Sequence, residues 1–141
     1  MHVLSLISEG QSKHTPLGAI VAECWNNIEK QFRVARCDAF VVMPNHIHGI
    51  LQINESEITS LSTVIQNFKS LSTRRINNVR KSPGQSVWQR NYYERIIRTE
   101  RALSLIRLYI KLNPVLWGKN LDLADMDLSE EKLSDLLSEF L

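Results

Sequence analysis

The sequence has little of what marks a secreted, membrane-spanning or zinc-binding protein. Its 141 residues include two cysteines, Cys24 and Cys37, which lie in apolar patterns without CxxC spacing. No disulfide framework or cysteine-based zinc site is therefore predicted. No apolar run approaches the roughly 18 residues of a membrane span, and the first residues lack the basic stretch of a signal peptide. With no repeat or low-complexity segment, we expect one compact, soluble, intracellular domain without a membrane partner.

The charges are strongly segregated, although the net charge is only +2. Residues 119–141 carry seven acidic and two basic side chains, which leaves a net charge of +7 on residues 1–118. The segment from Lys69 to Lys111 contains eleven basic residues and only two acidic ones, Glu94 and Glu100. Such a surface attracts polyanions. A set of solvated basic helix faces is the simpler alternative, and the acidic end could fold back over the basic surface and compete with a polyanion.

Hydrophobic periodicity predicts a mixed α+β chain. Thr15-Pro16 has the form of a helix N-cap followed by proline at the first helical position, and Asn113-Pro114 has the form of a helix stop. We predict strands at 3–7, 34–43 and 46–53 and within 87–98, and helices at 15–31, 60–80, 99–112 and 128–141. The turn signal Pro44-Asn45 joins the second and third strands into a hairpin.

The hairpin carries a pair of histidines, His46 and His48, separated by one apolar residue. Alternate side chains of a strand point to the same face, so both imidazoles are aimed at one point and Ile47 is buried behind them. This geometry suits a pair of metal ligands. Taken alone, the pattern more often marks histidines that are surface groups or hydrogen-bonded core groups.

A second pair of side chains, Tyr109 and Asn113, lies four residues apart on a predicted helix and therefore on one helix face. If that face meets the histidines, the site combines two imidazole nitrogens, an amide oxygen and a phenol. A mixed nitrogen and oxygen site with open positions suits Mg²⁺ or Mn²⁺ serving a phosphate substrate, and the tyrosine would be the nucleophile. The alternative is a packed aromatic residue followed by a helix C-terminal amide.

Four segments in this order resemble the motifs of the single-tyrosine HUH transposases (IS200-like), specifically the branch of REP-associated tyrosine transposases. They are Phe40-Val-Val-Met-Pro-Asn-His-Ile-His-Gly-Ile-Leu51, Phe68-Lys-Ser70, Val87-Trp-Gln-Arg-Asn-Tyr-Tyr-Glu-Arg-Ile-Ile-Arg98 and Tyr109-Ile-Lys-Leu-Asn-Pro114. The resemblance covers most of residues 15–118. It implies that His46, His48 and Asn113 bind the divalent metal and that Tyr109 cleaves single-stranded DNA beside hairpins.

The resemblance also implies an architecture and a cellular setting. The fold would be a ferredoxin-like antiparallel sheet with helices packed on it, in a transposase-like domain at 1–118 followed by an acidic helical tail at 119–141. The family's first strand has no counterpart, so Val3 to Ile7 fills its place, another chain donates a strand, or the chain is a truncated relic. A prokaryotic, cytoplasmic, nucleoid-associated protein that could form a homodimer is implied.

Three functions follow from this reading. The first is a metal-dependent transposase that nicks and rejoins single-stranded DNA through a 5′-phosphotyrosine. The second is a catalytically inactive, transposase-derived protein that binds DNA hairpins, and the third is an interaction protein whose acidic last helix recruits a partner. For the first two, the predicted DNA-binding residues are basic side chains and one tryptophan that could stack on bases or lie in the core: Lys69, Arg74, Arg75, Trp88, Arg90, Arg95 and Arg98.

Overall fold

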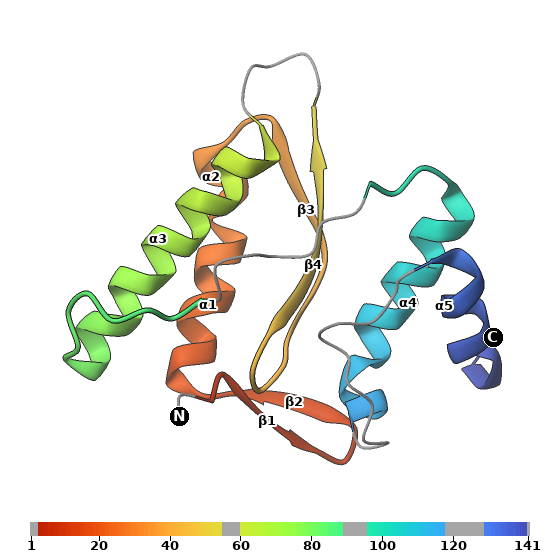
Figure 1. The fold of residues 1–141 in the computed structure, drawn as a ribbon, viewed down its shortest axis with the longest axis horizontal. Coiled ribbons are helices and arrows are strands. Elements are labelled where there is room, and N and C mark those ends of the chain that lie inside the picture. The colour runs from red at the N-terminus through yellow and green to blue at the C-terminus, as the bar shows by residue number, and fades with distance from the viewer. Residues whose placement is uncertain (1–2, 55–59, 89–95, 118–128, 141) are drawn as a thin grey trace.

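The computed structural model describes residues 3–54, 60–88, 96–117 and 129–140. The α+β class is confirmed (Figure 1). The elements are β1 (Ser5–Ser8), β2 (Gln11–His14), α1 (Pro16–Asn26), α2 (Ile28–Gln31), β3 (Ala35–Val42), β4 (Ile47–Ile53), α3 (Leu61–Arg80), α4 (Glu100–Trp117) and α5 (Glu130–Leu136), followed by a 3₁₀ turn at Ser138–Phe140.

The predicted hairpin of β3 and β4 lies at the centre of the molecule. Its strands are antiparallel, with Val41 opposite His48, and a bulge shifts the register between Cys37 and Phe40. In Figure 1, α1 and α3 lie on one side of the hairpin and α4 and α5 on the other. The hairpin is therefore a middle layer, and each of its faces is covered by helices.

Alternation along β4 divides its side chains between two cores. Ile47 and Leu51 pack with the cluster beneath α1 and α3, whereas Ile50 packs with the cluster beneath α4 and α5. Since β-strand side chains alternate between faces, His48 points toward α4. Ile47, the residue expected to lie behind the histidines, indeed contacts the opposite core.

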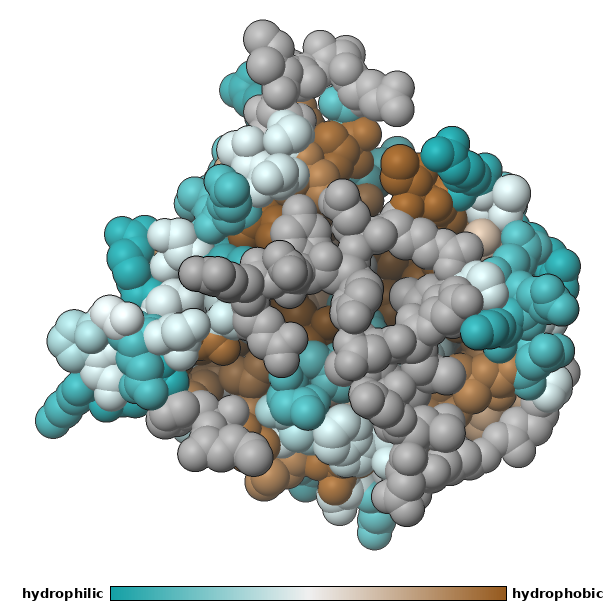
Figure 2. All heavy atoms as spheres, viewed as in Figure 1, coloured by the Kyte–Doolittle hydropathy of each residue, from teal (hydrophilic) through white to brown (hydrophobic). Residues whose placement is uncertain are grey.

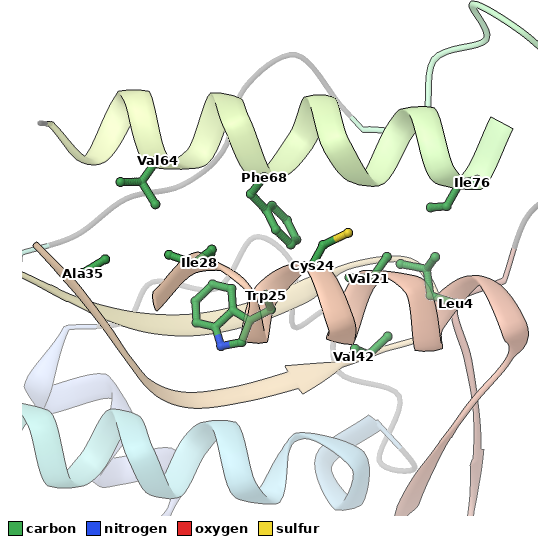
Figure 3. Close-up of a cluster of buried hydrophobic side chains, with 10 residues drawn as sticks. All are labelled: Leu4, Val21, Cys24, Trp25, Ile28, Ala35, Val42, Val64, Phe68 and Ile76. Carbon is green, nitrogen blue, oxygen red and sulfur yellow. The ribbon is translucent and has the colours of Figure 1, made fainter. Parts of the chain in front are cut away.

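The first core is built around Trp25 (Figure 3). The indole stacks on Phe40 with centroids 4.5 Å apart and meets Phe68 edge-on at 6.1 Å. Both arrangements are favourable for aromatic quadrupoles. The tryptophan fills the space next to Gly49 of β4, which fixes α1 and α3 against this face of the hairpin.

The start of α1 follows the sequence prediction. The Thr15 hydroxyl accepts a hydrogen bond from the Gly18 backbone N–H at 3.2 Å, and Pro16 occupies the first helical position. Gly18 is required for packing, because a Cβ there would lie 1.8 Å from the carbonyl oxygen of Leu4.

The predicted end of the third long helix is wrong. We expected it to stop at Asn113-Pro114, but α4 continues through Pro114 to Trp117. Proline within a helix removes one hydrogen bond and costs about 3 kcal/mol. The cost is offset here because Pro114 and Leu116 are buried, so tertiary packing overrides the local stop signal.

The ferredoxin-like sheet stays a prediction. The described strands form two separate antiparallel pairs, β1 with β2 and β3 with β4. β2 was not expected, because its sequence Gln-Ser-Lys-His is polar. β1 pairs with β2 and therefore does not fill the place of the missing strand beside β3 and β4. Most of the predicted strand within 87–98 lies outside the described residues.

Candidate active site

The two histidines converge at the tip of the central hairpin. The turn at Pro44-Asn45 is closed by a hydrogen bond of 2.8 Å from the Met43 N–H to the His46 carbonyl. The rings of His46 and His48 lie 4.9 Å apart at 80° to each other. Their Nε2 atoms are both shielded from solvent. The predicted convergence of the two imidazoles is therefore present in the structure.

Helix α4 brings the predicted nucleophile to this pair. The ring of Tyr109 lies 5.4 Å from that of His48, with the planes at 66°. At the C-terminal end of the same helix, the ring of Trp117 lies 6.1 Å from that of His46. Tyr109 is only 1% exposed. The chain segments that meet here are 61 residues apart in the sequence, from His48 to Tyr109.

Asn113 lies between these two contacts on the same helix face, one turn after Tyr109 and one turn before Trp117. It is fully buried, and its Nδ2 donates a hydrogen bond of 2.9 Å to the Tyr109 carbonyl. Its Oδ1 is buried and accepts no hydrogen bond from any described residue. Buried amide oxygens without a partner are uncommon and call for an explanation, such as an ion or water.

The orientation of His46 is set by its neighbour. The Nδ1 atom of His46 lies 2.6 Å from Asn45 Oδ1. A carboxamide oxygen can only accept, so in the neutral imidazole this contact places the proton on Nδ1 and the lone pair on Nε2. That tautomer is the one a histidine needs in order to bind a metal through Nε2.

An ion pair attaches α4 to the bulge of β3. Arg107 donates to both carboxylate oxygens of Asp38, from Nε at 2.9 Å and from the terminal NH2 at 2.6 Å. The guanidinium holds the pKa of Asp38 below its ordinary value, and the carboxylate raises the pKa of Arg107. Arg107 lies two residues before Tyr109, so the pair links this part of α4 to the hairpin, and a partly exposed pair of this kind contributes little to stability.

The predicted DNA-binding residues are not gathered at this site. Lys69, Arg74 and Arg75 belong to α3, which lies on the opposite side of the hairpin from α4 (Figure 1). Arg75 is paired with Glu23 at 2.5 Å, and burial lowers the pKa of Lys69. In Figure 2 the flank formed by α3 is covered mainly by hydrophilic side chains.

Of the remaining members of that set, the structure describes Trp88 and Arg98. Trp88 is part of the first core: it packs on Phe68 at 5.7 Å, and its indole N–H donates to Ser72 Oγ at 2.9 Å. Its core interpretation is therefore the one the packing supports. Arg98 is exposed just before α4. Arg90 and Arg95 lie outside the described residues.

Two residues at the site were missed by sequence reasoning. Asn45 was interpreted only as a turn signal, although it directly precedes His46. Trp117 could have been found by extending the Tyr109–Asn113 spacing by four residues, but the expected helix stop at Pro114 excluded it. Within the described ranges no group of three His, Cys, Asp or Glu residues could hold a metal.

Comparisons with known proteins identify the family. The sequence profile of the family described as "Transposase IS200 like" matches residues 11–113. The chain therefore belongs to the IS200-like transposases, and its function is transposase-like. No helix among the described residues is long and apolar enough to cross a bilayer.

Two curated relatives from Haemophilus influenzae (strain ATCC 51907 / DSM 11121 / KW20 / Rd) are similar to the chain. An "Uncharacterized protein" is 35% identical over 130 residues, covering 78% of this chain and 71% of the relative. A protein named "Putative REP-associated tyrosine transposase" is 31% identical over 87 residues, covering 57% of this chain and 49% of that protein. No solved structure matches the chain.

Proposed function

We propose that the protein is a divalent-metal-dependent enzyme that nicks and rejoins single-stranded DNA near hairpins, with Tyr109 as its nucleophile. The observation that carries the proposal is the contact between the Tyr109 and His48 rings, 5.4 Å apart, which joins the phenol to the histidine pair. Membership of the IS200-like transposases supports the substrate class.

The residues around Tyr109 fit a divalent metal. His46 and His48 would bind it through Nε2 and Asn113 through Oδ1, the buried amide oxygen that accepts no hydrogen bond from a described residue. Two imidazoles and one amide leave positions open for phosphate oxygens, which suits Mg²⁺ or Mn²⁺. When bound, the metal would polarise the scissile phosphate and orient it for attack.

The reaction would transfer a phosphodiester bond to the protein. The Oη atom of Tyr109, after losing its proton to solvent, attacks phosphorus, and the bond from phosphorus to the 3′ oxygen breaks. The departing 3′ oxygen takes up a proton, and the 5′ end remains attached as a phosphotyrosine. Attack by a free 3′-hydroxyl reverses these steps and rejoins DNA, so no hydrolytic base is required.

The burial of Tyr109 sets a condition on this reaction. A side chain that is 1% exposed cannot be reached by a phosphodiester, so α4 or the segments packed on it must move when DNA binds. The same burial favours the second function, a transposase-derived protein that binds single-stranded DNA or hairpins without cleaving them. The two functions differ in whether a covalent adduct forms.

The basic residues would hold DNA at a distance from the cut. Lys69, Arg74 and Arg75 lie on the layer opposite Tyr109, so we assign them to a part of the substrate remote from the scissile phosphate, such as a hairpin stem. Arg98, which lies just before α4, would contact phosphates nearer to this helix, and Arg90 and Arg95 remain proposed DNA contacts outside the described residues. Binding through such contacts should weaken steeply as salt rises.

The test is a cleavage assay with purified protein, Mn²⁺ or Mg²⁺, and hairpin oligonucleotides labelled at the 5′ or the 3′ end. We expect a covalent adduct that keeps the label downstream of the cut, disappears with a chelator and is absent in Tyr109→Phe. Cleavage that continues unchanged in Tyr109→Phe would disprove the assignment. Salt-sensitive hairpin binding without any adduct, unaffected by chelator, would establish the non-catalytic function instead.

A further inference from the structure

The three tryptophans of the chain occupy different environments. Trp25 is 4% exposed inside the first core. Trp88 packs on the same core and satisfies its indole N–H with the Ser72 hydroxyl. Trp117 is half-buried at the end of α4, where one side of it packs against the core beneath α4 and α5. Trp117 is therefore the tryptophan that lies beside His46 instead of in the first core.

Trp117 lies at the candidate active site. Its ring is 6.1 Å from that of His46, with the two planes tilted by 38°. It follows Asn113 by four residues, hence by about 6 Å along the helix axis. The face of α4 toward the hairpin tip therefore presents, in order, the phenol of Tyr109, the amide of Asn113 and the indole of Trp117.

We propose that Trp117 is a nucleobase subsite, which stacks on an unpaired base next to the scissile phosphate. The inference rests on the proposed function, because it takes His46, His48 and Tyr109 as the position of that phosphate. Nucleotides in a strand are about 3.4 Å apart, so a base about two nucleotides from the phosphate can reach Trp117, which lies about 6 Å from Asn113 along the helix axis. Aromatic platforms hold single-stranded bases in this way, and any base offers a π-face.

Stacking by Trp117 gives the single strand a role that cations cannot supply. Phosphate contacts retain duplex and single strand alike, whereas an indole can stack only on a base that is not already stacked on both sides. The subsite would therefore favour an unpaired base beside the cut.

The test combines protein and DNA changes. Single-stranded oligonucleotides with one abasic residue, placed in turn at each position around the cleavage site, are titrated into Tyr109→Phe protein with Mn²⁺ at fixed salt. Trp117→Leu and Trp117→Phe are made in this background. The matched control is Phe140→Leu, which alters another partly exposed aromatic residue, 37% exposed, on the 3₁₀ turn after α5.

We expect Trp117→Leu to weaken binding of intact DNA by about tenfold, while Trp117→Phe and Phe140→Leu retain most of the affinity. At one position, an abasic residue should weaken binding to the protein with Trp117 by a similar factor. The same abasic residue should not weaken binding to the Trp117→Leu protein any further. If the abasic and Trp117→Leu losses multiply at every position, or if Phe140→Leu is equally weak, the subsite is disproved.

Two further measurements keep the result independent of folding and of catalysis. Thermal unfolding checks each variant. If Trp117→Leu does not fold, the abasic scan is repeated with Trp117→Phe. DNA that stacks on the indole should quench the intrinsic fluorescence of the protein, and Trp117→Phe should lose this part of the quenching. Quenching that is unchanged in Trp117→Phe would count against the subsite. If the protein forms the covalent adduct but Trp117→Leu does not weaken DNA binding, the subsite alone is rejected. If Trp117→Leu weakens binding as expected but no adduct forms, the proposed cleavage alone is rejected.

Discussion

Gly49 is the residue at which the core and the candidate site can be coupled by one substitution. It lies on β4 next to His48 and faces the opposite core. In Gly49→Ala the new Cβ would lie 2.3 Å from Cη2 of Trp25 and 2.8 Å from Cζ2 and Cζ3. Trp25 cannot easily yield, because it is stacked on Phe40 and meets Phe68 edge-on. The strand itself must therefore shift.

The expected loss follows from two opposing effects. Overpacking a filled core costs about 1–3 kcal/mol. Replacing glycine by alanine returns about 0.4–1 kcal/mol by restricting the unfolded chain. We therefore expect Gly49→Ala to lower the free energy of unfolding by about 1–2 kcal/mol, since a Cβ contact of 2.3 Å is far inside van der Waals distance. A shifted β4 should also displace His48 and weaken Mn²⁺ binding.

The assay is urea unfolding followed by tryptophan fluorescence, with Mn²⁺ titrations on the folded protein. The control is Gly49→Ala combined with Trp25→Phe, since the smaller ring frees the space that the new Cβ needs. The double variant should lose less stability than the sum of the two single losses. Strictly additive losses, or a Gly49→Ala protein as stable as the parent, would refute the steric argument.

Three shorter predictions address the rest of the molecule. Because Arg107 lowers the pKa of Asp38, their pair stabilises the fold above the ordinary aspartate pKa near 4. This contribution is lost as pH falls through the lowered pKa. The difference between the urea midpoints at pH 7 and pH 3 should therefore be smaller in Asp38→Asn than in the parent protein. Asn45→Ala should weaken Mn²⁺ binding measured by calorimetry about 10-fold or more, while Asn45→Asp, which keeps the acceptor, should not. Leu133→Ala should cost about 2–5 kcal/mol in the same urea assay, because Leu133 is 1% exposed against α4, and a loss under about 1 kcal/mol would show that α5 is only loosely attached.

The parts of the site that could be predicted from sequence were those set by local periodicity. A two-residue spacing on a strand brings His46 and His48 together, and a four-residue spacing places Tyr109 and Asn113 on one helix face. The same reasoning located the Thr15 cap and the hairpin. The contact between this helix face and the hairpin joins segments far apart in the sequence. It therefore cannot be predicted from the residue pattern of either segment.

The layer that a residue joins is a long-range property in the same way. A basic helix reveals its polar face but not its layer, and the cations of α3 lie on the side of the hairpin opposite α4. A tryptophan such as Trp88 suits a stacking platform, and its packing on Phe68 and its hydrogen bond to Ser72 are contacts that the sequence does not reveal. At Pro114 the burial of neighbouring side chains outweighs the local preference to end the helix.

The two faces of β4 make stability and chemistry interdependent. Ile47, Gly49 and Leu51 hold the strand against the first core, and each alternates with a residue that faces α4. The histidine positions are therefore fixed by the packing of α1 and α3, which contribute no side chain to the candidate site. Tyr109 and Asn113 are positioned through other contacts, because α4 packs on the second core together with Ile50 and pairs with β3 through Arg107 and Asp38. Because the two halves of the site are held by different contacts, a change in the α4 attachment can expose Tyr109 while His46 and His48 keep their positions.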